Sequence, residues 1–192
     1  MPLIMIFTSY DNSGIFNYLS EIKGSYLFLS GYFAVVIMQN IVSMVGYSNE
    51  YEGAWIYEIL PIKNKRNIYT GMFKSSLIKL FLPSFILLSI IFAFIFGISV
   101  IKHMIVLLLS GILVSMATFK LNEKSLPFSK PYNVANSSKN MFVVFKAMFI
   151  TLILVGIHFG ICITKQSIFI YGYSFLLVGL IALLWNKVFT VK

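Results

Sequence analysis

The chain has 192 residues, of which 59% are hydrophobic and only 11% are charged, whereas soluble domains contain roughly 45–50% apolar and about 25% charged residues. This composition excludes an ordinary soluble domain. The formal net charge of +9 would suit nucleic acid if the basic residues formed a patch on a polar surface. Because they lie between long apolar runs instead, we expect a membrane protein and no nucleic-acid partner.

The first 24 residues open with the apolar run Met1–Tyr10. This run is too short to cross a bilayer and lacks the positively charged start of a signal peptide. It either lies in the outer membrane interface or is the end of a helix that begins upstream. We expect the second arrangement, in which the chain is the C-terminal portion of a longer protein.

Five later stretches are long enough to cross a bilayer as helices, since a hydrocarbon core of roughly 30 Å requires about 20 apolar residues. They are Ser25–Tyr47, Lys79–Ile101, Met104–Leu121, Met141–Ile163 and Ser167–Asn186. We therefore predict an all-α integral membrane protein with about five transmembrane helices and a short amphipathic helix on the inner surface. Residues 1–24 form a separate outer segment, and residues 25–192 form the transmembrane domain with its inner loop at 48–78.

Polar side chains within the spans are few. Gln39 and Asn40 are adjacent in the first span, and His158 lies in the fourth. An amide in lipid is costly unless it is partnered, so at least one of the two amides should face another helix. We interpret all three residues as helix contacts or, alternatively, as the lining of a substrate path. For His158 a proton or ligand role is a further alternative.

The inner loop contains a helix signature. Asn49 is a candidate N-cap, Glu52 is placed as its capping-box acid, and Pro61 ends the segment. A helix over Glu50–Leu60 would be imperfectly amphipathic. Its apolar row would consist of Tyr51, Trp55 and Ile59.

Three of the chain's six acidic residues, Glu50, Glu52 and Glu58, fall in this helix. A Trp anchor beside basic residues is typical of an interfacial helix with no further role. Acids are unfavourable against an anionic leaflet, however. They favour contact with a protein partner.

The distribution of Lys and Arg predicts the orientation, because short cytoplasmic loops retain these residues. If the 48–78 loop is inside, twelve of the fifteen Lys and Arg residues lie inside or at the inner boundary. The exceptions are Lys23, Lys102 and Lys165. We expect the N-terminal segment to lie outside and the C-terminus in the cytoplasm.

The reactive side chains do not form a recognisable catalytic or metal-binding motif. Two histidines, one cysteine (Cys162) and six acids supply no HExxH, no metal-spaced Cys/His cluster and no Ser/His/Asp set. The string at 71–76, GMFKSS, lacks the ending of a phosphate loop. We expect no enzyme activity, no metal and no cofactor in this chain, so any nucleotide would be bound by another subunit.

The inner loop carries an acid, then Trp-Ile-Tyr-x-x-Leu-Pro-Ile, then Gly-x-x-Lys and a proline. These positions are Glu52, Trp55, Ile56, Tyr57, Leu60, Pro61, Ile62, Gly71, Lys74 and Pro83, with Glu50 as a second acid. This order resembles the inner loop of ABC exporter permeases. The Leu-Pro-Phe-Ser string at Leu126–Ser129 also resembles a subgroup of uncharacterised bacterial permeases of this kind.

The resemblance implies that the inner loop docks on an ATPase subunit. The docking residues it implies are Glu50, Glu52, Trp55, Glu58, Pro61, Gly71 and Lys74. We expect a permease subunit of an ATP-driven transporter in a bacterial cytoplasmic membrane, with a second permease half or a second copy as a further partner. The alternative is a small membrane interaction, immunity or regulatory protein that transports nothing.

Overall fold

The computed structural model describes residue 18 and residues 22–62, 64–122, 125–132 and 138–189, without the side chains of 58 and 138–140. The predicted apolar run Met1–Tyr10 lies outside these ranges. The elements in chain order are η1 (Tyr26–Gly31), α3 (Tyr32–Met44), β1 (Tyr47–Ser48), η2 (Tyr51–Trp55), α4 (Ile56–Ile59), α5 (Lys65–Ser75), η3 (Ser76–Phe81), α6 (Leu82–Phe96), η4 (Ile98–Val100), α7 (Ile101–Leu121), β2 (Lys130–Pro131), α8 (Ser138–Ile163) and α9 (Ser167–Phe189). Of the η segments, η3 is π-helical and the others are 3-10 helices.

The prediction of an all-α, multi-pass membrane protein is confirmed. The described part of the chain contains five helical stretches that are long and apolar enough to cross a membrane. They are Tyr26–Met44, Lys65–Phe96, Ile98–Leu121, Met141–Ile163 and Ser167–Phe189. The fourth has the predicted bounds, and the others differ from prediction at one or both ends.

The second span differs most. Its helix begins at Lys65 rather than at Lys79, because α5, η3 and α6 follow one another without a break over 32 residues. It ends at Phe96 rather than at Ile101, because Gly97 takes a positive φ of 87° that stops the helix. The chain then turns through η4 into α7, which starts at Ile101. This places His103 inside the third helix and not in a loop before it.

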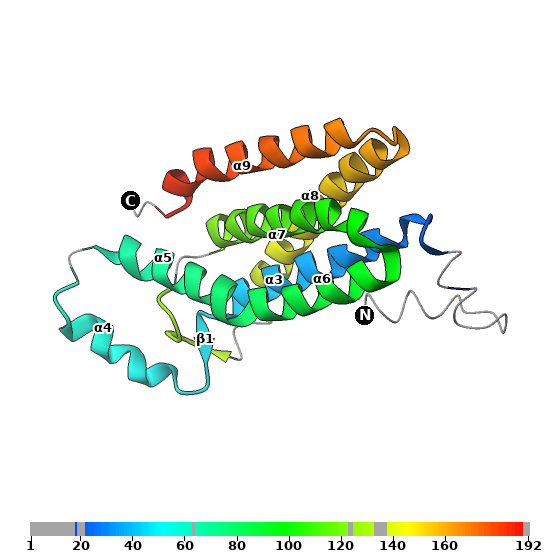
Figure 1. Cartoon of the computed structure of the whole chain (residues 1–192). Helices are drawn as coiled ribbons and strands as arrows, with labels where there is room; N and C mark the ends of the chain where they lie inside the picture. The colour runs from blue at the N-terminus through cyan, green and yellow to red at the C-terminus, as the bar shows by residue number, and fades with distance from the viewer. Residues whose placement is uncertain (1–17, 19–21, 63, 123–124, 133–137, 190–192) are drawn as a thin grey trace.

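Helix α7 occupies the centre of the bundle and packs against α3, α8 and α9 (Figure 1). Two glycines allow α3 and α7 to approach closely. A Cβ added to Gly31 would lie 2.8 Å from Leu107 Cδ1, and one added to Gly111 would lie 3.0 Å from Met38 Sδ. Small residues at such contacts allow helix backbones to pack tightly in membranes.

The bundle has two distinct ends (Figure 1). The α4 end carries α4, the start of α5, the last turn of α9 and a short parallel pairing in which Tyr47 of β1 lies opposite Lys130 of β2. The η1 end carries η1, η4 and the turn between α8 and α9. There Lys102 Nζ donates to Ser167 Oγ at 2.7 Å and links α7 to α9.

Near the α4 end, a cluster of packed aromatic side chains joins α5 to the rest of the bundle. It contains Tyr69 and Phe73 of α5, Phe119 of α7, and Phe189 of α9. Phe73 is fully buried, and its ring centroid lies 5.3 Å from that of Phe189 and 6.5 Å from that of Phe119. Edge-to-face aromatic pairs of this kind add about 0.5–1.5 kcal/mol each beyond the area they bury. We call this set the α5 aromatic cluster.

Candidate functional site

The predicted inner-loop helix is present but is built differently from the prediction. Residues Tyr51–Trp55 form the 3-10 helix η2, and only Ile56–Ile59 are α-helical. The predicted Asn49 cap is wrong: the N-cap of η2 is Glu50, which makes no side-chain cap hydrogen bond, and the Glu50 backbone N–H donates to Ser48 Oγ at 3.0 Å. This hydrogen bond joins residues only two positions apart, next to the pairing of Ser48 in β1 with Pro131 in β2.

The end of this segment agrees with the sequence. Leu60 is extended, with φ −68° and ψ 134°, and Pro61 follows it. The residue before a proline avoids the helical region because its backbone would clash with the proline ring. Pro61 therefore ends α4 as expected. We call residues 50–62 the α4 segment.

The α4 segment exposes apolar side chains beside acids. Trp55 is 59% exposed and Ile59 is 70% exposed. Glu50 and Glu52 are also exposed, whereas the side chain of Glu58 lies outside the described residues. Contiguous apolar side chains rimmed by charge are typical of protein interaction surfaces.

A groove runs between the α4 segment and the loop that contains Leu126 and Ser129. Its volume is about 570 Å³, and its lining includes Glu52, Trp55, Lys65, Leu126 and Ser129. The loop that contains Leu126 and Ser129 is held in place by two backbone hydrogen bonds. The Phe128 N–H donates to the Val45 carbonyl, and the Lys130 N–H donates to the Gly46 carbonyl. The two strings on which the family resemblance depends are thus neighbours in the fold.

The other two predicted docking residues belong to α5. Gly71 is exposed, and an added Cβ there would meet nothing within 4 Å in the described structure. Lys74 is also exposed, but its Nζ lies 5.7 Å from the ring centroid of Trp185 on α9. Lys74 therefore contributes to the packing of α5 on α9 through a cation–π contact.

The two adjacent amides have different environments. Gln39 is fully buried and Asn40 is partly buried. Neither Gln39 Oε1 nor Nε2 has a hydrogen-bond partner among the described residues. Gln39 therefore lies within the bundle without a hydrogen bond to another helix in that part of the chain.

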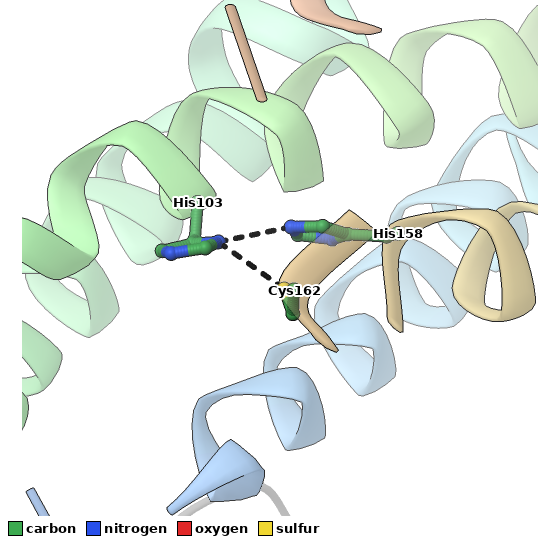
Figure 2. Close-up of side chains that lie close together, drawn as sticks. All are labelled: His103, His158 and Cys162. Carbon is green, nitrogen blue, oxygen red and sulfur yellow. Dashed lines mark hydrogen bonds between the residues drawn. The ribbon is translucent and has the colours of Figure 1, made fainter. Parts of the chain in front are cut away.

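His158 on α8 belongs to a buried polar cluster (Figure 2). Its side chain is fully buried, and its Nε2 lies 3.0 Å from Nδ1 of His103 on α7. Cys162, one helical turn after His158, places its Sγ 3.8 Å from the same His103 nitrogen. On the other side of the ring, His158 Nδ1 lies 3.1 Å from Tyr32 Oη of α3. His158 is thus a helix contact, one of the interpretations offered from the sequence.

The grouping of His103 with His158 and Cys162 was missed from the sequence. His103 is 55 residues from His158, and the predicted third span began one residue after it. The spacing His158-x-x-x-Cys162 was visible, and it places both side chains on one helix face. This pair was the only signal of the cluster in the sequence, because the third side chain, His103, comes from α7.

Comparisons with protein-family models, with curated proteins and with solved structures found no match to this chain. The partner ATPase and the transport activity therefore remain predictions from the loop residues.

Proposed function

We propose that this chain is the membrane-spanning permease subunit of an ATP-driven transporter of the ABC exporter class, coupled to a separate ATPase through the α4 segment. The exposed side chains of Trp55 and Ile59, next to Glu50 and Glu52, carry the proposal. A soluble partner with an apolar pocket and basic rim would bury these aromatic and aliphatic groups and pair with the acids.

The charge distribution supports a cytoplasmic α4 end and C-terminus, and the family resemblance implies that the membrane is a bacterial inner membrane. Basic side chains are concentrated on the parts of the chain that lead to the α4 end, as short cytoplasmic segments require. Those that the structure describes there are Lys65, Arg66, Lys74, Lys79, Lys120, Lys130, Lys146 and Lys187, against Lys23, Lys102 and Lys165 near the η1 end.

The connection between α4 and the bundle suits mechanical coupling. The chain passes from the α4 segment into the uninterrupted helical stretch Lys65–Phe96. The α5 aromatic cluster fastens the first part of this stretch to α7 and α9. A push on the α4 segment when the ATPase closes would therefore move packed helices as a rigid body.

The helical stretch Lys65–Phe96 contains a segment that is suited to bending. The π-helical segment η3, Ser76–Phe81, separates α5 from α6. Segments of π-helix frequently occur at functional sites because they disturb the regular hydrogen-bond ladder. In the proposed cycle, α5 follows the ATPase while α6 adjusts its tilt at η3.

The test is a site-specific photo-crosslink in the native membrane. A photoreactive residue at position 55 should crosslink to a P-loop ATPase that co-purifies with the tagged chain and hydrolyses ATP. The same residue at Phe175, which is 81% exposed on the spanning helix α9, is the matched control and should crosslink to lipid. Crosslinks from position 55 only to lipid, or to proteins that are not ATPases, would contradict the proposal and favour the interaction or regulatory protein.

A further inference from the structure

We propose that His103, His158 and Cys162 form a binding site for a single Cu(I) ion inside the helical bundle. The site does not depend on the α4 segment or on transport. Its three possible ligand atoms all lie within 4.8 Å of one another. Figure 2 shows the side chains converging from α7 and α8 on one point.

The separations suit metal coordination. Metal–nitrogen bonds of about 2.0–2.1 Å and metal–sulfur bonds of about 2.3 Å place ligand nitrogens roughly 3.3–3.6 Å apart and a nitrogen about 3.8 Å from a sulfur. The two imidazole nitrogens are 3.0 Å apart, and the His103 Nδ1 to Cys162 Sγ distance is 3.8 Å. The two imidazole nitrogens must therefore move apart slightly to admit an ion, and the third pair, His158 Nε2 and Cys162 Sγ, lies within 4.8 Å.

Tyr32 supplies the support that orients a metal-binding histidine. Its hydroxyl donates to the Leu154 carbonyl at 3.4 Å, which leaves its oxygen to accept the His158 Nδ1–H at 3.1 Å. This arrangement fits the tautomer in which His158 carries its proton on Nδ1 and directs the Nε2 lone pair toward His103. Hydrogen bonds of this kind hold the ligating tautomer in known metal sites.

Binding of Cu(I) at this site requires neither an oxidant nor a reductant. In the empty site, His103 Nδ1–H donates to His158 Nε2. When the ion binds, the His103 proton moves to its other ring nitrogen, and the Cys162 thiol loses its proton to solvent. Three metal–ligand bonds form, one proton is released, and the oxidation state of the ion does not change.

The ligands and the charge balance favour Cu(I) over a dication. A thiolate with two imidazoles selects soft ions such as Cu(I) and Zn²⁺. Cu(I) with one thiolate is neutral, whereas a bare dication would leave a positive charge in apolar surroundings, which is costly. Lys102 next to His103 adds to that penalty, and the acidic side chains that the structure describes, Glu50 and Glu52, lie at the α4 end.

An ion can reach the site from the η1 end. A cavity of about 170 Å³ opens there, and its lining includes Phe28, Ser99, Lys102 and His103. His103 is only partly buried, whereas His158 and Cys162 are buried. His103 would therefore meet the ion first and pass it inward to complete the three-coordinate site.

The test is Cu(I) binding to the purified 192-residue chain in detergent, under anaerobic and reducing conditions and in competition with a Cu(I) chelator. We expect one Cu(I) per chain by elemental analysis and an X-ray absorption spectrum with one sulfur and two nitrogen neighbours. Cys162→Ser and His103→Gln should each weaken binding by at least about 100-fold. Tyr32→Phe should weaken it by about 10- to 100-fold through loss of the supporting hydrogen bond.

The control is Met148→Leu, which removes the sulfur of a 43% exposed residue on the same helix α8 and should leave affinity unchanged. Unfolding temperatures of the metal-free variants establish that each is folded. Unchanged Cu(I) affinity in folded Cys162→Ser and His103→Gln would overturn the site. Tighter binding of Zn²⁺ than of Cu(I) would overturn the choice of ion. Neither result bears on the crosslink from position 55, so the two proposals fail separately.

Discussion

Replacing Trp55 with alanine tests the α4 segment as a docking surface most directly. A tryptophan buries about 150–250 Å², and 59% of Trp55 is still exposed. Its contact with a partner would therefore bury about 90–150 Å². At about 25 cal/mol per Å² this area is worth about 2–4 kcal/mol, or a roughly 30- to 800-fold increase in Kd.

The assay is the binding of the purified ATPase to the chain in lipid nanodiscs, measured as Kd for wild type and Trp55→Ala. Thermal unfolding should be unchanged, because η2 has no buried residues. Phe175→Ala is the control that removes an aromatic side chain from a spanning helix, one that is 81% exposed against 59% for Trp55. A Kd within threefold of wild type for Trp55→Ala would refute the docking role. Glu52→Lys should also weaken binding, mainly by slowing association.

Three further substitutions and one control variant, Gly156→Val, test the bundle, with the free energy of unfolding measured by SDS titration. Gln39→Leu should stabilise the chain by about 1–3 kcal/mol, since it removes a buried amide without a partner in the described structure; a loss of stability would show that the amide is satisfied. Gly31→Val should destabilise by about 1–3 kcal/mol through contact with Leu107, whereas Gly156→Val, with nothing within 4 Å among the described residues, should change stability by less than about 0.5 kcal/mol. Gly97→Ala should cost about 1–3 kcal/mol because φ is 87° and ψ is 169° there, and an equal stability would contradict this reading of the turn.

The ends of the elements show where sequence reasoning succeeds and where it does not. Pro61 ends α4 as predicted, because the clash that a proline imposes on Leu60 is local to the chain. The N-cap was assigned to Asn49, whereas Ser48 accepts the first free N–H. This contact spans only two residues, and the helix that begins there is the 3-10 segment η2, whose own N-cap, Glu50, makes no side-chain cap hydrogen bond.

The two candidate sites also differ in how well the sequence predicted them. The exposed Trp55 and Glu52 were identified from the sequence because they follow one another along a single short segment. The cluster of His103 with His158 and Cys162 was not, because helix packing brings its parts together across 55 residues. The predicted loop position of His103 also concealed it, since the positive φ of Gly97 starts the third helix earlier than hydropathy indicated.

The sequence by itself determined the five spanning helices and the all-α class, because a bilayer requires long apolar segments whose backbone hydrogen bonds are satisfied within each helix. The tertiary structure alone decided which faces of those helices meet. Gly31 and Gly111 bring α3 close to α7, and α7 against α8 brings His103 to His158. Lipid and neighbouring helices are equally apolar surroundings, so hydropathy carries little information about which side of a helix is covered.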